Sequence, residues 1–139
     1  MSRTSKRKTQ LSSYEVKVDK METMHFRVAV YARLSVDSTD KKNESIENQI
    51  AVAEKYINEN SNMTIAGIYT DLGATGTDFE RTGFQKMLMD IRMKKINCVV
   101  VKDFSRFGRN YIETGNYLEK IFPFMGVRFI SVTDQYDSL

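Results

Sequence analysis

Hydrophobic residues along this chain follow two spacings, one typical of β-strands and the other typical of amphipathic helices. Four short segments rich in β-branched and apolar residues predict strands at 26–31, 64–69, 96–101 and 127–132. The segment at 96–101 is apolar at nearly every position, which favours a strand buried on both faces of a sheet.

Between these segments, apolar residues recur every three or four positions and predict three helices, at about 45–60, 84–91 and 112–122. Helices that alternate with strands predict an α/β fold, with a mainly parallel sheet of about four to five strands and right-handed crossovers. The residues expected to bound these helices are Asn43 or Ser45 at the start of the first helix, and Pro123 and Gly126 at the end of the third.

In such a sheet the carboxyl ends of the parallel strands meet at one edge, where α/β proteins bind their ligands. These ends and the loops after them are expected at 32–35, 70–76, 102–109 and 133–136. Several side chains with chemical potential come from them or from the adjoining loops, namely Arg33, Ser35, Asp71, Arg81, Arg106 and Arg109. We therefore expect four arginines to converge near one serine hydroxyl.

An arginine cluster beside a serine is suited to phosphate chemistry. The planar guanidinium binds two phosphate oxygens at once and stays charged at any working pH. It also suits the more highly charged transition state of a phosphodiester, which a serine hydroxyl could attack. Each residue also has an ordinary structural interpretation: Ser35 can be a turn residue, Arg106 and Arg109 can be solvated, and Tyr31 can belong to the core or to the wall of a site.

Composition removes several other kinds of site. The only histidine, His25, precedes the first strand and the only cysteine, Cys98, lies in an apolar strand, so neither a Ser-His-Asp triad nor a zinc cluster is supported. Glycine-rich nucleotide-binding motifs are missing, and Asp71 alone would hold magnesium poorly. We expect no cofactor, no metal and no small-molecule substrate. The lone cysteine, and the lack of an apolar run of membrane length, favour a cytoplasmic protein with no membrane partner.

Charge divides the chain into two parts. The net charge is +3, and residues 1–25 hold six of the 21 basic and three of the 18 acidic residues, which leaves 15 of each in residues 26–139. We expect residues 1–25 to be a flexible basic lead, which could contact DNA phosphates or simply be solvated. Residues 26–139 are expected to form one domain that is neutral overall.

The polar residues of this edge lie in motifs that resemble those of the serine site-specific recombinases, the resolvase and invertase family. Four blocks in the same order carry the resemblance: Tyr31-Ala32-Arg33-Leu34-Ser35, Gln49 within residues 45–49, Asp71 with the residues 73–76 and Arg81, and Ser105-Arg106-Phe107-Gly108-Arg109-Asn110. The similarity runs from about Phe26 to Leu139. The continuation at 111–113 and the ending at 133–138 are most similar to the large serine recombinases of mobile transposons.

This resemblance implies a resolvase-like three-layer sandwich and a DNA recombinase. Ser35 would attack a phosphodiester of double-stranded DNA and form a 5′-phosphoserine link, with strand exchange and religation following in a tetramer, for the integration or excision of a mobile element. Arg33, Arg81, Arg106 and Arg109 would hold the phosphate, and Gln49 and Asp71 would position their neighbours. The reaction would conserve phosphodiester energy and need neither ATP nor a metal.

Two features depart from the family pattern. Many members carry an aspartate immediately before the arginine of the last block, where this chain has Ser105, and Asp103 is a nearby but unaligned carboxylate. The family also continues into a long interface helix and DNA-binding domains, so a chain ending at Leu139 is expected to be a fragment that is inactive by itself. The alternatives are a non-catalytic α/β assembly or regulatory module and a small-phosphate binder, and the serine with four arginines favours the enzyme.

Overall fold

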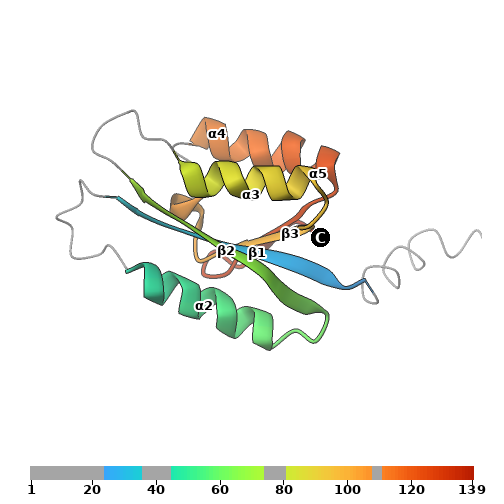
Figure 1. Cartoon of the computed structure of the whole chain (residues 1–139), viewed down its shortest axis with the longest axis horizontal. Helices are drawn as coiled ribbons and strands as arrows, with labels where there is room; N and C mark the ends of the chain where they lie inside the picture. The colour runs from blue at the N-terminus through green and yellow to red at the C-terminus, as the bar shows by residue number, and fades with distance from the viewer. Residues whose placement is uncertain (1–23, 36–44, 74–80, 108–110) are drawn as a thin grey trace, which may run out of the picture.

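The computed structural model of this chain describes residues 24–35, 45–73, 81–107 and 111–139 (Figure 1). Within them, five strands form one sheet with the order β2-β1-β3-β4-β5. Strands β1 to β4 run parallel, and β5 is antiparallel to β4. The strands are β1 (Phe26–Ser35), β2 (Met63–Gly73), β3 (Cys98–Val101), β4 (Arg128–Ser131) and β5 (Tyr136–Asp137).

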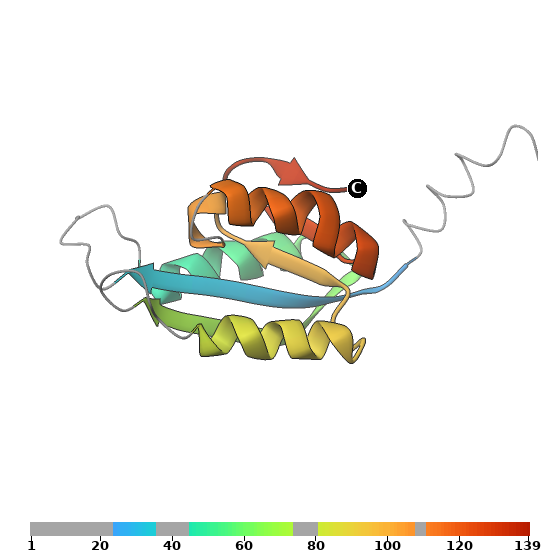
Figure 2. The ribbon, with the colours of Figure 1, turned by 90° about the horizontal axis from the view of Figure 1, so that it is seen from above.

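Helices cover both faces of the sheet (Figure 1). Helix α2 (Ile46–Asn58) lies on one face, whereas α3 (Thr82–Arg92) and a longer helical segment lie side by side on the other (Figure 2). This longer segment consists of α4 (Tyr111–Asn116), the π-helical turn η2 (Tyr117–Ile121) and α5 (Phe122–Met125). The predicted α/β three-layer sandwich with a mainly parallel sheet is therefore confirmed.

The alternation of residues in β1 supplies both halves of the core. Val28 and Val30 pack toward α2, in a cluster that includes Ala53 and Ile57 of that helix. Ala29 and Tyr31 face the opposite layer and join a larger cluster of buried side chains from α3, β3 and β4. Because every second β1 residue is buried on each face, this strand is fixed at the centre of the molecule.

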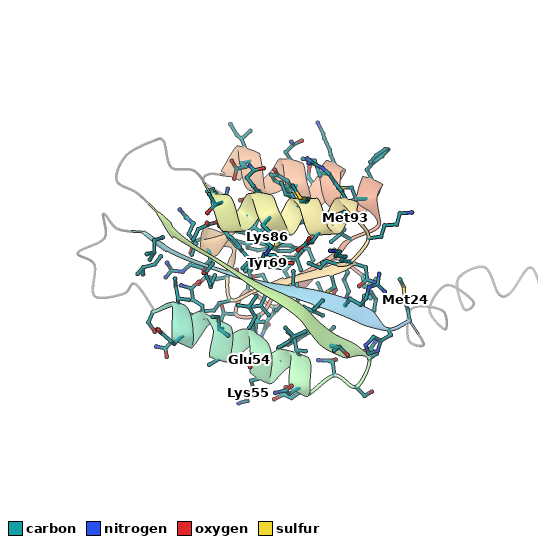
Figure 3. All side chains as sticks on the ribbon, in the orientation of Figure 1. Met24, Glu54, Lys55, Tyr69, Lys86 and Met93 are labelled. Carbon is teal, nitrogen blue, oxygen red and sulfur yellow. The ribbon has the colours of Figure 1, made fainter. Side chains whose placement is uncertain are left out.

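A partly buried hydrogen bond attaches α3 to the sheet. The hydroxyl of Tyr69 on β2 donates to Oδ2 of Asp90 on α3 over 2.5 Å. Figure 3 shows Tyr69 between the two elements. Burial, and then this carboxylate, raise the pKa of Tyr69 well above the usual range of a phenol.

The central strands and the third helical segment differ from the sequence prediction. Strands β1 and β2 run to Ser35 and Gly73, so Asp71, expected in a loop, lies within a strand. Pro123 does not end the third helical segment but lies in the first turn of α5. Proline has no N–H and clashes with the carbonyl four residues back, and the wider π turn precedes it. The segment ends at Gly126, which has a φ of 72° in the left-handed region.

The ends of α2 and β4 also bear on the sequence prediction. Ser45 caps α2, since its Oγ accepts from the backbone N–H of Asn48 over 3.2 Å. After β4 the chain turns back as the short strand β5, which the hydrophobic pattern does not mark. Most of the expected N-terminal lead, and the alternative cap Asn43, lie outside the described residues.

Candidate active site

The carboxyl ends of β1 and β2 bring the expected site residues to one edge of the sheet. Arg33 pairs in register with Asp71, and Ser35 pairs with Gly73 at the last step of the ladder. The backbone of Ser35 is thus the end of the central strand. The side chain of Ser35 and all of Arg109 lie outside the described part of the structure.

Gln49 holds the backbone of β1 just before Ser35. Its Oε1 accepts from the N–H of Arg33 over 3.1 Å, and its Nε2 donates to the carbonyl of Arg33 over 3.0 Å. Strand β3 pairs with β1 only as far as Tyr31, so this buried amide supplies backbone partners two residues further on. Gln49 therefore fixes the segment that carries Arg33 and Ser35, because both backbone groups of Arg33 are satisfied by one side chain.

Asp71 joins β1, β2 and α3. Its Oδ2 accepts from the hydroxyl of Tyr31 over 2.7 Å and from the N–H of Phe84 over 2.9 Å, and its Oδ1 accepts from the N–H of Gly83 over 2.7 Å. Arg81, at the N-cap position of α3, makes no side-chain capping bond, so the carboxylate of Asp71 caps the helix instead. A negative charge at the start of a helix is favourable, because the free N–H groups of the first turn point toward it.

Arg81 lies at the centre of the same network and is only 7% exposed. Its Nη1 donates to Oε1 of Glu113 on α4 over 2.5 Å, and its Nη2 donates to the carbonyl of Phe107. Its Nε approaches the hydroxyl of Tyr31 at 3.4 Å, and its guanidinium lies 3.9 Å from the centre of the Phe84 ring. The charge of Arg81 is thus balanced by Glu113 and shielded by rings, as a buried guanidinium requires.

Arg33 and Arg106 approach this network from the ends of β1 and β3. A short 3₁₀ turn, η1 (Phe104–Arg106), follows β3, and Nη2 of Arg33 donates to the carbonyl of Ser105 in this turn over 3.0 Å. Burial lowers the pKa of the Arg33 guanidinium, and the positive charges of Arg81 and Arg106 lower it further. Because Arg33 and Arg81 donate to the carbonyls of the two residues that flank Arg106, the three arginines form one cluster.

Residues 28–139 match the protein-family model described as "Resolvase, N terminal domain". This chain belongs to that family.

Solved structures of the resolvase family agree with this assignment. The N-terminal catalytic domain of TP901-1 integrase aligns with a TM-score of 0.68 and 28% identity, over 81% of each chain. A resolvase family site-specific recombinase from Streptococcus pneumoniae aligns with a TM-score of 0.67 and 30% identity, over 81% of this chain and 76% of that one. The C-terminal catalytic domain of ISC1926 TnpA, an IS607-like serine recombinase, aligns with a TM-score of 0.60 and 27% identity, over 76% of this chain and 67% of that one. Comparison with curated proteins finds no match.

Three further residues contribute to this resolvase-family site: Tyr31, which the sequence left open between the core and the wall of a site, and Glu113 and Asp103, which were not predicted as site residues. Tyr31 links Asp71 to Arg81, Glu113 pairs with Arg81, and Asp103 contacts Arg106. Glu113 was visible only as part of a motif continuation, because nothing local in the sequence says which buried charge it balances. The sequence offers only a general reason to look for such a partner: an arginine that is predicted to be buried at the sheet edge needs a carboxylate from another element to balance its charge.

No group of three or more histidine, cysteine, aspartate or glutamate residues in the described ranges is placed to hold a metal ion. None of the helices described in the structure is long and apolar enough to cross a membrane. Cys98 is buried in β3, and this burial raises the pKa of its thiol to about 12, which favours a core role.

Proposed function

We propose that this domain cuts and rejoins double-stranded DNA at specific sites, with Ser35 as the nucleophile. The observation that carries the proposal is the gathering of three arginines at the sheet edge where β1 ends in Ser35. Arg33 donates to the carbonyl of Ser105 and Arg81 donates to the carbonyl of Phe107, the two residues on either side of Arg106. A cluster of guanidinium groups can neutralise a phosphodiester and the additional negative charge of its transition state.

The proposed cleavage is a transesterification that conserves energy. The bond between Oγ of Ser35 and phosphorus forms as the bond between phosphorus and the 3′ oxygen breaks. One proton leaves the serine, in which a neighbouring arginine can assist, and one proton arrives at the new 3′-hydroxyl. The phosphate stays on the 5′ strand end as a phosphoserine, and attack by a 3′-hydroxyl reverses the step. Each rejoined bond replaces a cleaved bond of the same kind, so ATP is not needed.

The site residues divide into two groups in this proposal. Arg33, Arg106 and Arg109 are assigned to the scissile phosphate. Gln49 and Asp71 are assigned to positioning, which their hydrogen bonds to the Arg33 backbone and to the start of α3 support. Precise placement of reacting groups is itself a large part of catalysis.

Arg81 requires a more specific assignment. We expected it to hold the phosphate, but its guanidinium donates to Glu113 and Phe107 and is almost fully buried. In this arrangement Arg81 adds positive potential to the site and fixes its walls. A direct contact with phosphate would have to use the second N–H of Nη1 or Nη2, since these bonds engage only three of the five donors of the guanidinium.

DNA strand exchange also implies self-association. One serine cuts one strand, so exchange between two duplexes requires four subunits. We propose that the domain acts within such a tetramer of the full-length protein, on the ends of a mobile element.

The test is to look for the covalent intermediate. The full-length natural protein is incubated with a duplex spanning the junction of its mobile element, nicked a few nucleotides to the 5′ side of the cut. The short fragment that carries the 3′-hydroxyl then diffuses away, so the phosphoserine accumulates. We expect a denaturant-stable adduct whose peptide mass places the DNA on Ser35.

The matched variants are Ser35→Ala and Ser61→Ala, the latter in an exposed turn before β2. Ser35→Ala should abolish the adduct while leaving the unfolding transition unchanged, and Ser61→Ala should behave as the wild type. A wild-type protein that binds this duplex but never forms an adduct would favour a non-catalytic assembly module.

A further inference from the structure

Asp103 is a carboxylate next to the arginine cluster that no part of the proposed reaction uses so far. It lies two residues after the end of β3, at the N-cap position of the turn η1. Its Oδ1 accepts from Oγ of Ser105 over 2.5 Å and from the backbone N–H of Arg106 over 3.2 Å. The same oxygen lies 3.8 Å from Nε of Arg106, and Oδ2 lies 3.9 Å from Nζ of Lys102.

One oxygen of Asp103 therefore accepts a hydrogen bond from the backbone of Arg106 and lies within ion-pair distance of its guanidinium. The backbone bond fixes where the arginine leaves the chain, and the ion pair restricts where its head can point. Arg106 is 13% exposed and Asp103 is 22% exposed, so the attraction is screened less than it would be on an open surface.

The turn that Asp103 caps also receives the second arginine. The carbonyl of Ser105, in the middle of η1, accepts from Nη2 of Arg33. Arg33 and Arg106 repel each other, since the charge of Arg106 is among the causes that lower the pKa of Arg33. A fixed negative charge beside Arg106 offsets this repulsion and allows two guanidinium groups to remain close together without substrate.

We propose that Asp103 is the positioning residue that holds Arg106, and with it the arginine cluster, in the orientation that receives the scissile phosphate. This inference rests on the proposed function. Asp103 is not assigned a contact with DNA and acts through Arg106.

A purely structural role for Asp103, as the cap of η1, predicts different behaviour. Asparagine caps helices as well as aspartate does, so Asp103→Asn keeps an acceptor for the Arg106 N–H but removes the charge. Asp103→Glu keeps the charge but is a weaker cap. The positioning role predicts that the asparagine variant is the slower enzyme, and a capping role predicts the reverse.

Asp134 provides a matched control for the loss of charge. Its Oδ2 accepts from the N–H of Phe104, in the same turn, and from Oγ of Ser131. Asp134→Asn therefore removes a carboxylate that is bonded to η1 through Phe104 and, among the described residues, makes no hydrogen bond to an arginine. With this variant the adduct should form at the wild-type rate.

The experiment measures adduct formation in single turnovers, using the full-length protein and the nicked junction duplex. Protein is in excess, so that the rate at saturation is separated from the affinity for DNA. Asp103→Asn should lower the saturated rate by about tenfold or more, because misplacing a reacting group by a fraction of an ångström is costly, and should leave affinity within about twofold. Asp103→Glu should retain more of the rate.

A spectroscopic measurement supports or overturns the inference without any catalysis. In ¹⁵N-labelled protein, the Nε–Hε signal of Arg106 should move in Asp103→Asn and stay in place in Asp134→Asn. Suppose that the wild-type protein forms the adduct, and that Asp103→Asn forms it at the same rate with the Arg106 signal in the same place. This result would refute the positioning role and leave the proposed function intact. Absence of the adduct in the wild-type protein would instead refute the proposed function.

Discussion

Buried polar side chains give this site its shape at the scale of single residues. Tyr31 is 1% exposed, and its hydroxyl donates to Asp71 and lies within 3.4 Å of Nε of Arg81. A hydroxyl or a charge buried in this way is costly unless its partners are present, so removing one member leaves the others unsatisfied. These residues are therefore less exchangeable than the aliphatic core around them.

The protonation of Tyr31 makes the network testable through pH. Burial raises the pKa of the Tyr31 phenol well above its usual range, the charge of Arg81 opposes the shift, and the bond to Asp71 adds to it. A raised folded-state pKa gives stability that is complete below the unfolded pKa of about 10 and is lost as the pH rises above it. Tyr31→Phe lacks this titration.

We therefore expect Tyr31→Phe to be less stable than the wild type at pH 7, by about 2 kcal/mol for a hydrogen bond to a charged group. The difference in the free energy of unfolding between the two proteins should narrow above about pH 10, by at most about 1.4 kcal/mol per pH unit. Urea unfolding from pH 7 to pH 11 measures both values. A difference in unfolding free energy that stays constant over this range would mean that the pKa of Tyr31 is the same in the folded and unfolded protein.

At the scale of elements, hydrophobic periodicity predicted the interior of each strand but did not predict the strand ends, where the site begins. Alternation of apolar residues located β1 up to Tyr31, but Arg33 and Ser35 are polar positions of the same strand. Asp71 was assigned to a loop for the same reason, although β2 continues to Gly73. Functional residues replace the apolar ones that mark a strand, so the pattern stops before the structure does.

The contact between the end of β2 and the start of α3 depends on the absence of a side chain at Gly83. A Cβ there would lie 2.4 Å from the carbonyl oxygen of Thr70 and 3.0 Å from Oδ1 of Asp71. Backbone cannot yield as a flexible side chain does, so α3 would have to move away from the carboxylate that caps it. The N–H of Gly83 makes one of those capping bonds.

Gly83→Ala should therefore destabilise the domain by about 2 kcal/mol or more, through strain and the weakened cap. Gly115→Ala in α4 is the matched control, because its Cβ would meet nothing within 4 Å. That substitution should be neutral, or stabilising by up to about 1 kcal/mol, because alanine favours a helix. Urea unfolding compares the two variants, and equal stabilities would refute the argument from close approach.

At the scale of the whole molecule, neutral overall charge conceals a local gathering of arginines at one edge of the sheet. Residues 26–139 hold 15 basic and 15 acidic residues, so bulk charge predicted no nucleic-acid surface. The order of elements did predict that Arg33, Arg81 and Arg106 would meet, because parallel strands bring their carboxyl ends together. The pairing of Arg81 with Glu113, 32 residues away, could not be predicted, since it depends on how α4 packs beside α3.

The same distribution of charge predicts how the reaction responds to metal removal. Guanidinium groups, rather than a divalent cation, are assigned to neutralise the phosphate. Adduct formation on the nicked duplex should therefore proceed at the wild-type rate in EDTA, with sodium chloride matching the ionic strength of the magnesium buffer. Binding of the duplex, measured in both buffers, controls for effects of magnesium on the DNA itself. A rate that falls in EDTA at unchanged binding, and returns with added magnesium, would mean that carboxylates such as Asp71 act through a cation and that the arginine cluster alone does not stabilise the transition state.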